Sequence, residues 1–449
     1  MNNEFFKKYD VPAPRYTSYP TVPYWQETPT AETWTAHLRK ALEAPSSQWS
    51  CYLHIPFCEN LCTYCGCNTL ITKDHKKEHP YIEQVLKEWN LYLQQVPELE
   101  SRSLRHLHLG GGTPTFLSVD SLKALLEPFL SKVKKSDSGF EGSIEVDPRH
   151  TSREQLAALR ELGFNRVSMG VQDFNLEVQK LVNRIQPFEI TAELTKAARD
   201  LGYESVNFDL IYGLAKQNLE SMQESMDLTI QLRPDRIALY SLALVPWIKP
   251  AQRLFKDEDL PTGAEKRALY EYSRQRLLSA GYVEVGMDHF ALPNEALAKA
   301  MANKTLHRNF MGYTDVRTDV LLGLGVSSIS ETPWSFHQNE KVLPQYERMV
   351  GSGEIPTLRG HVLSKEDILH RGQVLELMTK FQVEFSSADQ KKDAEQFLAE
   401  MAEDQLIEIQ GQTLRITEAG RPFLRNACVF FDQHLRKSKP DTQIFSKSI

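Results

Sequence analysis

Short apolar runs separated by helical patterns recur between residues 51 and 245, and no other feature restricts the possible folds of this chain as strongly. Strands that alternate with helices are joined by right-handed crossovers and lie parallel in one sheet. Six such units are too few for a closed eight-stranded barrel, so the pattern predicts an α/β fold, either a partial (β/α)6 barrel or a doubly wound sheet. The expected strands are residues 51–55, 105–109, 143–146, 166–169, 205–210 and 236–242, and the expected helices are residues 81–93, 121–133, 155–162, 190–201 and 219–231.

The two ends of the chain follow other patterns. Prolines are closely spaced in residues 1–25, which favours an extended arm over a helix. The tail predicts two helices, a hairpin around Gly411 and Gln412, and a third helix, at residues 365–381, 388–401, 406–417 and 419–424. The predicted division is an arm over 1–36, a barrel with an extension over 37–358, and a mainly helical, winged-helix-like domain over 359–449.

Charge restricts the partners of the chain. Winged-helix modules often bind DNA, but residues 360–449 carry 12 basic and 14 acidic side chains. The whole chain has a formal net charge of −7, which disfavours nucleic acid as a partner and favours a packing or lid role for the tail. No run of about 20 apolar residues is present, and the first residues do not resemble a signal peptide. We therefore expect a cytoplasmic protein that does not enter a membrane.

Five of the six cysteines lie between residues 51 and 67, a spacing that indicates a metal centre rather than a disulfide framework. Cys58, Cys62 and Cys65 follow the first expected strand. Three thiolates can bind three irons of a [4Fe–4S] cluster and leave the fourth iron open to another ligand. The alternative is a zinc site with Cys67 as the fourth ligand. The single loop favours iron and sulfide, because zinc sites usually pair two separated cysteine hooks.

Further polar and glycine residues stand at the ends of expected strands. Residues 108–114, His-Leu-Gly-Gly-Gly-Thr-Pro, end the second strand and form either a tight turn or a close approach to a ligand. At or just past the carboxyl ends of later strands lie Glu145, Gln172, Asp209 and Ala243. Each could simply cap a helix or face water. Their shared position at one rim indicates a binding site.

The cysteine loop, together with Tyr64 before its third cysteine, resembles that of the radical S-adenosylmethionine (SAM) superfamily. The resemblance implies that the open iron of a [4Fe–4S] cluster binds the amino and carboxylate groups of SAM. It also implies that reduction of the cluster cleaves SAM to methionine and a 5′-deoxyadenosyl radical. The glycine motif at 108–114 is similar to the segment that contacts the methionine part of SAM in that superfamily.

Within the superfamily, the chain resembles the oxygen-independent coproporphyrinogen III oxidase family almost from end to end. The similar segments are residues 9–20, 58–67, 144–149, 168–174, 183–184, 209–213, 286–290, 306–310, 323–327, 424–426 and 431–432. The resemblance implies oxidative decarboxylation of two propionates of coproporphyrinogen III to vinyl groups, giving protoporphyrinogen IX in haem biosynthesis. The alternative is the haem-binding chaperone of the same superfamily. That chaperone generally lacks the arm motif at 14–20 and the Cys-Gly-Cys sequence at 65–67, which are both present here.

The resemblance also implies the residues of the site. Cys58, Cys62 and Cys65 match the cluster ligands, and Cys67 matches a cysteine that is not a ligand. The family binds two SAM molecules. Residues that match contacts to the cluster-bound SAM are Tyr52, Tyr64, Gly111, Glu145 and Ile329, and residues that match contacts to the second SAM are Gly112, Thr113, Gln172, Arg184, Asp209 and Ala243. A direct ion pair between Arg184 and Asp209 is the alternative explanation for that pair of charges.

For the substrate we expect a locally basic pocket, because coproporphyrinogen III carries four propionates. Arg15 and Arg308 are its candidate residues, with surface salt bridges as the alternative. The chain departs from the family pattern at Ala13, Ala215, Met311 and Asp315. The histidines His54, His108, His289 and His307 are either acid or substrate contacts or structural residues.

The expected partners follow from this chemistry. A reduced flavodoxin or ferredoxin is the expected electron donor, because such clusters can have potentials near about −400 mV or lower. The chain contains no heptad pattern, and we expect a monomer.

Overall fold

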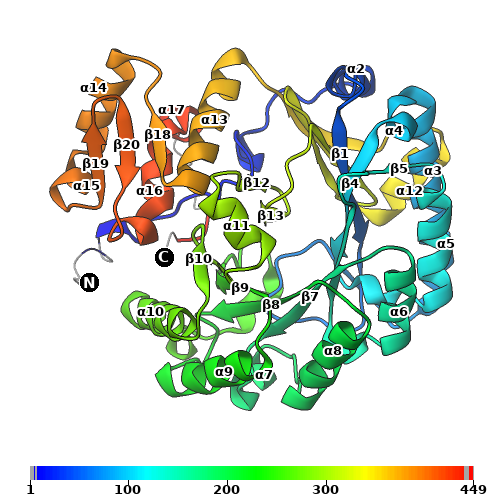
Figure 1. Cartoon of the computed structure of the whole chain (residues 1–449), viewed down its shortest axis with the longest axis horizontal. Helices are drawn as coiled ribbons and strands as arrows, with labels where there is room; N and C mark the ends of the chain where they lie inside the picture. Colours follow the sequence, from blue (N-terminus) through cyan, green and yellow to red (C-terminus); the bar gives the residue numbers. More distant parts are fainter. Residues whose placement is uncertain (1–4, 6–7, 439–443, 448–449) are drawn as a thin grey trace.

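A curved sheet of parallel strands forms the centre of the computed structural model, which describes residues 5, 8–438 and 444–447 (Figure 1). All six expected strands are present, and they neighbour one another in chain order with every pair parallel. They are β1 (Gln48–Ile55), β4 (Ser103–Gly111), β6 (Glu141–Val146), β7 (Arg166–Gln172), β8 (Ser205–Tyr212) and β9 (Arg236–Ser241). Their carboxyl ends therefore meet at one edge of the sheet.

Helices cover the outer side of this sheet (Figure 1). The five expected helices are α3 (Glu78–Gln95), α5 (Val119–Leu130), α6 (Arg153–Glu161), α8 (Phe188–Asp200) and α9 (Leu219–Leu232), and the short α4 (Glu98–Ser101) and α7 (Leu176–Leu181) accompany them. Ser118, Ser152 and Asn218 cap α5, α6 and α9 by accepting hydrogen bonds from backbone N–H groups of the first turn. Apolar side chains of these helices and the strands form one core. This arrangement is the expected partial barrel.

The sheet continues beyond the six strands at both edges. β14 (Val320–Leu324) pairs parallel with β1, and antiparallel strands follow it. The added elements are β15 (Ile329–Glu331), β16 (Ser335–Asn339) and β17 (Thr357–Val362) at one edge, β11 (His289–Ala291) and β10 (Val283–Val285) at the other, and β5 (Lys134–Lys135) beside β4. Three-residue strands are too short to show a periodicity, so the sequence does not predict most of them. The helices of this region are α10 (Gly263–Ser279), α11 (Ala296–Ala302) and α12 (Leu343–Gly351).

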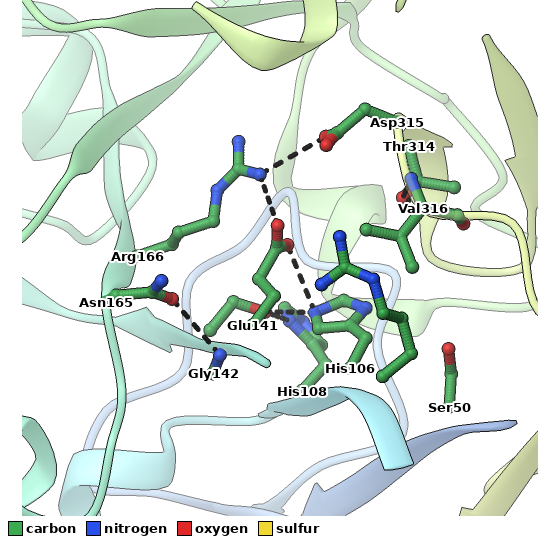
Figure 2. Close-up of polar contacts among 12 residues, drawn as sticks. Ser50, His106, His108, Glu141, Gly142, Asn165, Arg166, Thr314, Asp315 and Val316 are labelled. Carbon is green, nitrogen blue, oxygen red and sulfur yellow. Dashed lines mark hydrogen bonds and ion pairs between the residues drawn. The ribbon is translucent and has the colours of Figure 1, made fainter. Parts of the chain in front are cut away.

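A buried ion network fills the barrel at the amino ends of its strands (Figure 2). Arg166 Nη1 donates to Glu141 Oε2 at 2.6 Å and to Asp315 Oδ1 at 3.2 Å. Its Nη2 donates to Glu295 Oε1 at 2.7 Å. Arg236 also pairs with Glu295 and donates to Asp315 at 2.9 Å. Two guanidinium groups thus share three carboxylates, which satisfies charges that would be costly to bury alone.

The tail forms a separate packed unit with its own apolar core. Its elements are α13 (Lys365–Lys380), β18 (Gln382–Glu384), α14 (Ala388–Phe397), α15 (Ala399–Glu403), β19 (Ile407–Gln410), β20 (Thr413–Ile416), α16 (Leu424–Cys428) and α17 (Gln433–Lys437). The hairpin turns at Gly411, whose φ of 59° suits glycine. The helix expected at 419–424 is wrong in its position. Pro422 lies in a 3-10 turn over Arg421–Phe423, and α16 begins only after it.

The arm packs against this C-terminal unit. Tyr9, Tyr16 and Tyr19 belong to the same apolar cluster as α13 and α16. The prediction of an extended arm is only partly right, because Phe5, Lys8 and Tyr9 are helical where no proline precedes them. A 3-10 turn at Val22–Tyr24 and α2 (Ala31–Ala41) follow.

Two structural facts bear on the division at residues 36 and 358. Trp34 of α2 lies in the barrel core, and β17 crosses the second boundary. The division itself stays a prediction. Within the described residues, none of the helices combines the length and the apolar character that a membrane span needs.

Candidate functional site

A cavity opens at the carboxyl ends of the parallel strands, where the sequence places its rim residues. The cavity is continuous with solvent and is lined mainly by residues at and beyond the strand ends. Its lining includes Cys58, Cys62, Tyr64, Cys65, Cys67, Gly111, Gly112, Thr113, Glu145, Gln172, Arg184 and Asp209. The topology therefore brings most of the predicted site residues together, although they span 150 residues of sequence.

The cysteine loop begins on a short strand and is anchored at several points. β2 (Phe57–Cys58) pairs with β3 (Leu70–Ile71), which fixes the two ends of the loop. In its middle, the Thr63 amide donates to the Val182 carbonyl at 3.1 Å. Hydrogen bonds from the Cys67 thiol and amide lower the pKa of the Cys65 thiol to about 6. A thiolate at neutral pH is the form that binds a metal.

Two arginines face the cysteine loop from the barrel. Arg184 Nη1 lies 3.6 Å from Cys62 Sγ, and Arg149 Nη2 lies 3.8 Å from the same atom. Both arginines also bind Asp147, at 2.8 and 2.7 Å. Burial alone would raise the pKa of Asp147, but these two charges outweigh it and lower that pKa to about 2. The fixed positive groups suit an anionic thiolate cluster.

The four loop cysteines, Cys58, Cys62, Cys65 and Cys67, all line this cavity as free thiols. Four thiols suit a zinc site, and three of them suit an iron–sulfur cluster with one open iron. The thiols by themselves are compatible with both kinds of metal centre.

Comparison with known proteins agrees with this geometry. Residues 52–229 match the model of the radical SAM superfamily. The chain is 39% identical over 452 residues to the oxygen-independent coproporphyrinogen III oxidase of Salmonella typhimurium, covering 99% of this chain and 97% of the relative. It is 38% identical over 443 residues to the enzyme of the same name from Pseudomonas aeruginosa, covering 96% and 95%. The solved structure of coproporphyrinogen III oxidase from Escherichia coli, described as a radical SAM enzyme, matches with a TM-score of 0.88 at 37% identity over 94% of this chain and 98% of that one.

This chain belongs to the oxygen-independent coproporphyrinogen III oxidase family. It is accordingly a radical SAM oxidoreductase, a class that uses a [4Fe–4S] cluster and SAM.

The glycine motif of this oxidase is shaped by the protein's own packing. Gly111 has a φ of 114°, and a Cβ there would lie 2.6 Å from the His54 ring. A Cβ on Gly112 would lie 2.7 Å from the Phe57 carbonyl oxygen. Both glycines allow β4 to pass close to the end of β1, which brings the cysteine loop to the rim. These close contacts are within the protein itself, and the close approach to a ligand stays a prediction.

A chain of hydrogen bonds runs from inside the barrel to Glu145 at the rim (Figure 2 shows its His106 and His108). His108 Nε2 lies 3.2 Å from Glu145 Oε1, and the Gly111 amide donates to Glu145 Oε2 at 3.2 Å. Burial would raise the pKa of Glu145, but these two hydrogen bonds outweigh it, so that pKa is lowered. Ser143 Oγ lies 2.6 Å from His108 Nδ1 and 2.7 Å from His106 Nε2.

The number of protons available determines which group donates and which accepts at each step of this series of hydrogen bonds. An ionised Glu145 only accepts, so the His108 tautomer that fits this contact has its proton on Nε2 and accepts at Nδ1. Ser143 has one proton and gives it to His108, which leaves its oxygen to accept from His106. Burial lowers the pKa of His106 to about 4, so His106 is neutral and donates from Nε2. Glu145 thus determines the His108 tautomer, and Ser143 links that ring to His106, whose Nε2 also lies 3.5 Å from Glu141 Oε1. The sequence does not indicate this linking role of Ser143.

Of the residues predicted for a second SAM, Gln172 and Asp209 lie on β7 and β8, the two strands that follow β6 in the sheet. Gln172 has a φ of 68° at the bulged end of β7, and Arg184 Nη2 donates to the Gly170 carbonyl at 2.6 Å. Asp209 accepts from Ser168 at 2.7 Å and from Asn207 at 3.0 Å, and burial raises its pKa to about 6. The alternative of a direct pair between Arg184 and Asp209 is wrong.

Not every predicted residue lines the cavity. Tyr52, Ala243 and Ile329 are outside its lining, although the Tyr52 ring stacks on His108 with centroids 5.7 Å apart. The Ala243 carbonyl is tied to that of Tyr64, because Gln252 Nε2 donates to both at 3.0 Å. All these site assignments stay predictions.

Of the two departures near the substrate, Met311 lines the cavity, whereas Asp315 belongs to the ion network. Asp147, Arg149, Ser168 and Asn207 also line the cavity, and sequence reasoning did not identify them. His108 and His289 line the cavity as well, and His54 packs beside it against Gly111.

We predict that Cys58, Cys62 and Cys65 bind the cluster and that Cys67 does not, because a fourth ligand would close the open iron to SAM. Each cysteine is replaced by serine, and iron and sulfide are measured after anaerobic reconstitution. We expect Cys67→Ser to retain its iron and the other three variants to lose it. Cys428→Ala, in the core of the C-terminal unit, is the matched control. Complete iron loss in Cys67→Ser would contradict the assignment.

We predict that Ser143→Ala weakens SAM binding about tenfold while the iron content is unchanged. Without the hydroxyl, His108 Nδ1 loses its donor, and the ring is held less firmly against Glu145, the expected SAM contact. Equilibrium dialysis with labelled SAM measures the affinity. Ser143→Thr, which keeps a hydroxyl, should restore binding, and Ser131→Ala on the exposed end of α5 should have no effect. Equal affinity in Ser143→Ala and the unaltered protein would remove Ser143 from the site.

Proposed function

We propose that this protein carries out the oxygen-independent oxidative decarboxylation of two propionates of coproporphyrinogen III, forming the vinyl groups of protoporphyrinogen IX in haem biosynthesis. The observation that carries the proposal is identity of 38–39% to enzymes of that name over nearly the whole chain. The family's arm and cysteine loop are both present in this chain. The arm motif at 14–20 and the Cys-Gly-Cys sequence at 65–67 are the two features that the haem-binding chaperone generally lacks. Their presence favours the enzyme.

The residues present fit the cofactors. Cys58, Cys62 and Cys65 would hold the cluster, and Arg184 and Arg149 would balance its negative charge. When bound, the cluster and SAM supply a 5′-deoxyadenosyl radical that removes a hydrogen atom from the propionate β-carbon. The protein's contribution is to orient the substrate and to keep water and oxygen away from the reacting carbon.

Two SAM molecules per chain are part of the proposal. Glu145 and the Gly111 backbone are the expected contacts of the first SAM, and Arg184 and Asp209 are expected contacts of the second. Arg184 already pairs with Asp147, so its charge does not by itself require a ligand. Asp209 accepts only from neutral groups, Ser168 and Asn207, and it lines the cavity. A buried carboxylate acceptor suits the hydroxyls of a ribose.

The remaining partners follow from the same chemistry. We propose a reduced flavodoxin or ferredoxin as electron donor, because the cluster must be reduced at low potential. All six cysteines are free thiols, which suits a reducing cytoplasm. We propose that the protein acts as a monomer.

The test of the function is product formation. The reconstituted protein is incubated anaerobically with coproporphyrinogen III, SAM and a low-potential reductant, and the products are identified by mass spectrometry. We expect protoporphyrinogen IX with a mono-vinyl intermediate, and none from Cys62→Ser, which lacks a cluster ligand. Haem binding without any vinyl product, in protein that still cleaves SAM, would favour the chaperone instead.

We predict that Asp209→Asn binds one SAM per chain where the unaltered protein binds two, because the amide presents a donor where the ribose hydroxyl needs an acceptor. Labelled SAM in equilibrium dialysis gives the stoichiometry, and the cluster absorbance shows that the first site is intact. Arg184→Ala should behave in the same way, with the added loss of a contact to Cys62. Asp200→Asn, an exposed carboxylate paired with Lys196, is the control. One SAM in every protein would refute the second site.

A further inference from the structure

Three arginines gather where the arm, the β12–β13 hairpin and the C-terminal unit meet. Arg15 lies on the arm, Arg308 on β12 (His307–Asn309) before β13 (Gly312–Thr314), and Arg425 on α16. Arg308 and Arg425 are only 7% and 6% exposed, and Arg15 is half-buried. Arg308 Nη2 donates to the Arg15 carbonyl at 3.2 Å, so two of the three arginines touch directly.

Backbone carbonyls, rather than carboxylates, receive the hydrogen bonds of these arginines. Arg15 Nη2 donates to the Ser241 carbonyl at 2.7 Å. Arg425 donates to the carbonyls of Ala13 and Lys447 at 3.2 and 2.8 Å. The Arg308 guanidinium lies 4.4 Å from the centre of the Tyr313 ring, and its buried Nε has no hydrogen-bond partner. Within the described residues, none of the three forms an ion pair with a carboxylate.

A second cavity, lined by Arg15 and Arg425, also contains more arginines than carboxylates. Its lining contains five arginines and four carboxylates. The ion pairs there are Arg267 with Glu271, Arg274 with Glu284 and Glu418, and Arg421 with Glu284 and Glu418. The fourth carboxylate, Asp288, lies 2.7 Å from His289 Nδ1. Arg15 and Arg425 are the two arginines of the lining that have no carboxylate partner.

The local charge is therefore positive although the whole chain is acidic. Burial, followed by the neighbouring charge of Arg15, lowers the pKa of Arg425 to about 10. The pKa of Lys266 is lowered to about 8, first by burial and then, among its neighbours, by Arg15 and Arg425. Buried charges without counter-ions are costly. The nearby carboxylates are Asp288 and Asp10, and against Arg15, Arg308, Arg425 and Lys266 they leave two positive charges to be balanced.

This positive region adjoins the cavity of the cysteine loop. Tyr240 and His289 line that cavity, and their chain neighbours Ser241 and Asp288 line the second one. Tyr313, beneath Arg308, also lines the first cavity. Tyr313 therefore places Arg308 next to the first cavity, and Arg308 in turn contacts Arg15.

We propose that Arg15, Arg308 and Arg425 form a carboxylate-binding site that holds the two propionates of the tetrapyrrole that do not react. The proposal rests on the proposed function, which names the substrate. Two carboxylates would balance the two surplus charges, and a planar guanidinium binds a carboxylate through paired hydrogen bonds. Arg425, which the sequence does not single out, joins the two predicted arginines through the packing of the arm on α16.

The test compares coproporphyrin III, a stable fluorescent tetra-acid, with its tetramethyl ester. Binding is measured by fluorescence in the reconstituted protein and in Arg308→Gln, Arg425→Gln and Arg425→Lys. We expect each glutamine variant to bind the acid about tenfold to a hundredfold more weakly and the ester as the unaltered protein does. Arg425→Lys should be intermediate, because it keeps the charge but loses the paired geometry.

The controls separate folding and function from the site itself. Arg436→Gln removes an arginine that pairs with Asp393 in the same C-terminal unit, and it should leave both affinities unchanged. Thermal unfolding and SAM cleavage show that each variant is folded and that its radical site is intact. Equal affinity of all variants for the acid would refute the carboxylate site while the proposed function stands. No binding of the acid by the unaltered protein would count against the proposed function and the site together.

Discussion

The parallel pairing of six strands is the constraint on which the rest of the molecule depends. Because every strand runs in the same direction, its last residue reaches the same rim, and groups far apart in sequence face one cavity. The cysteine loop follows the first strand, Glu145 ends the third and Asp209 lies near the end of the fifth. The opposite end of the barrel cannot remain open to water, and there Arg166 and its carboxylates fill the interior. One end is thus sealed by charge pairs, and the other is left for chemistry.

The sequence predicts the repeated units well because each strand and helix carries its own periodicity. All six parallel strands and five covering helices lie where the pattern places them. Contacts that depend on packing could not be predicted in this way. The Arg184–Asp147 pair joins two loops 37 residues apart, and no local pattern marks Asp147 as its partner. The Ser143 hydroxyl acts through two histidines whose neighbourhood exists only after the sheet forms. The 3-10 turn at Arg421–Phe423 could not be predicted either. Pro422 is compatible with the first turn of an α-helix and with a 3-10 turn, so the sequence does not decide between them.

The arm and the C-terminal unit are better understood together than as two appendages. Tyr16 donates to Asp432 at 3.2 Å, and Asn426 donates to the Tyr9 carbonyl at 2.9 Å. These contacts join the arm to residues 424–426 and 431–432, two short segments that resemble the family as the arm does. The start and the end of the chain meet over one side of the barrel, and arginines from both take part in one positive region.

The ion network also determines how much of the chain must exist before the barrel can be stable. Arg236 finds its carboxylates only in Glu295 and Asp315, and β1 gains its second parallel neighbour only with β14. A growing chain that has completed the sixth strand therefore still holds an uncompensated guanidinium at its centre and an open sheet edge. The segment that matches the superfamily, residues 52–229, ends before the sixth strand and contains neither Arg236 nor β14. The partners of Arg236 and the neighbour of β1 both come from residues 295–324, so a chain cut after β9 would lose the two together.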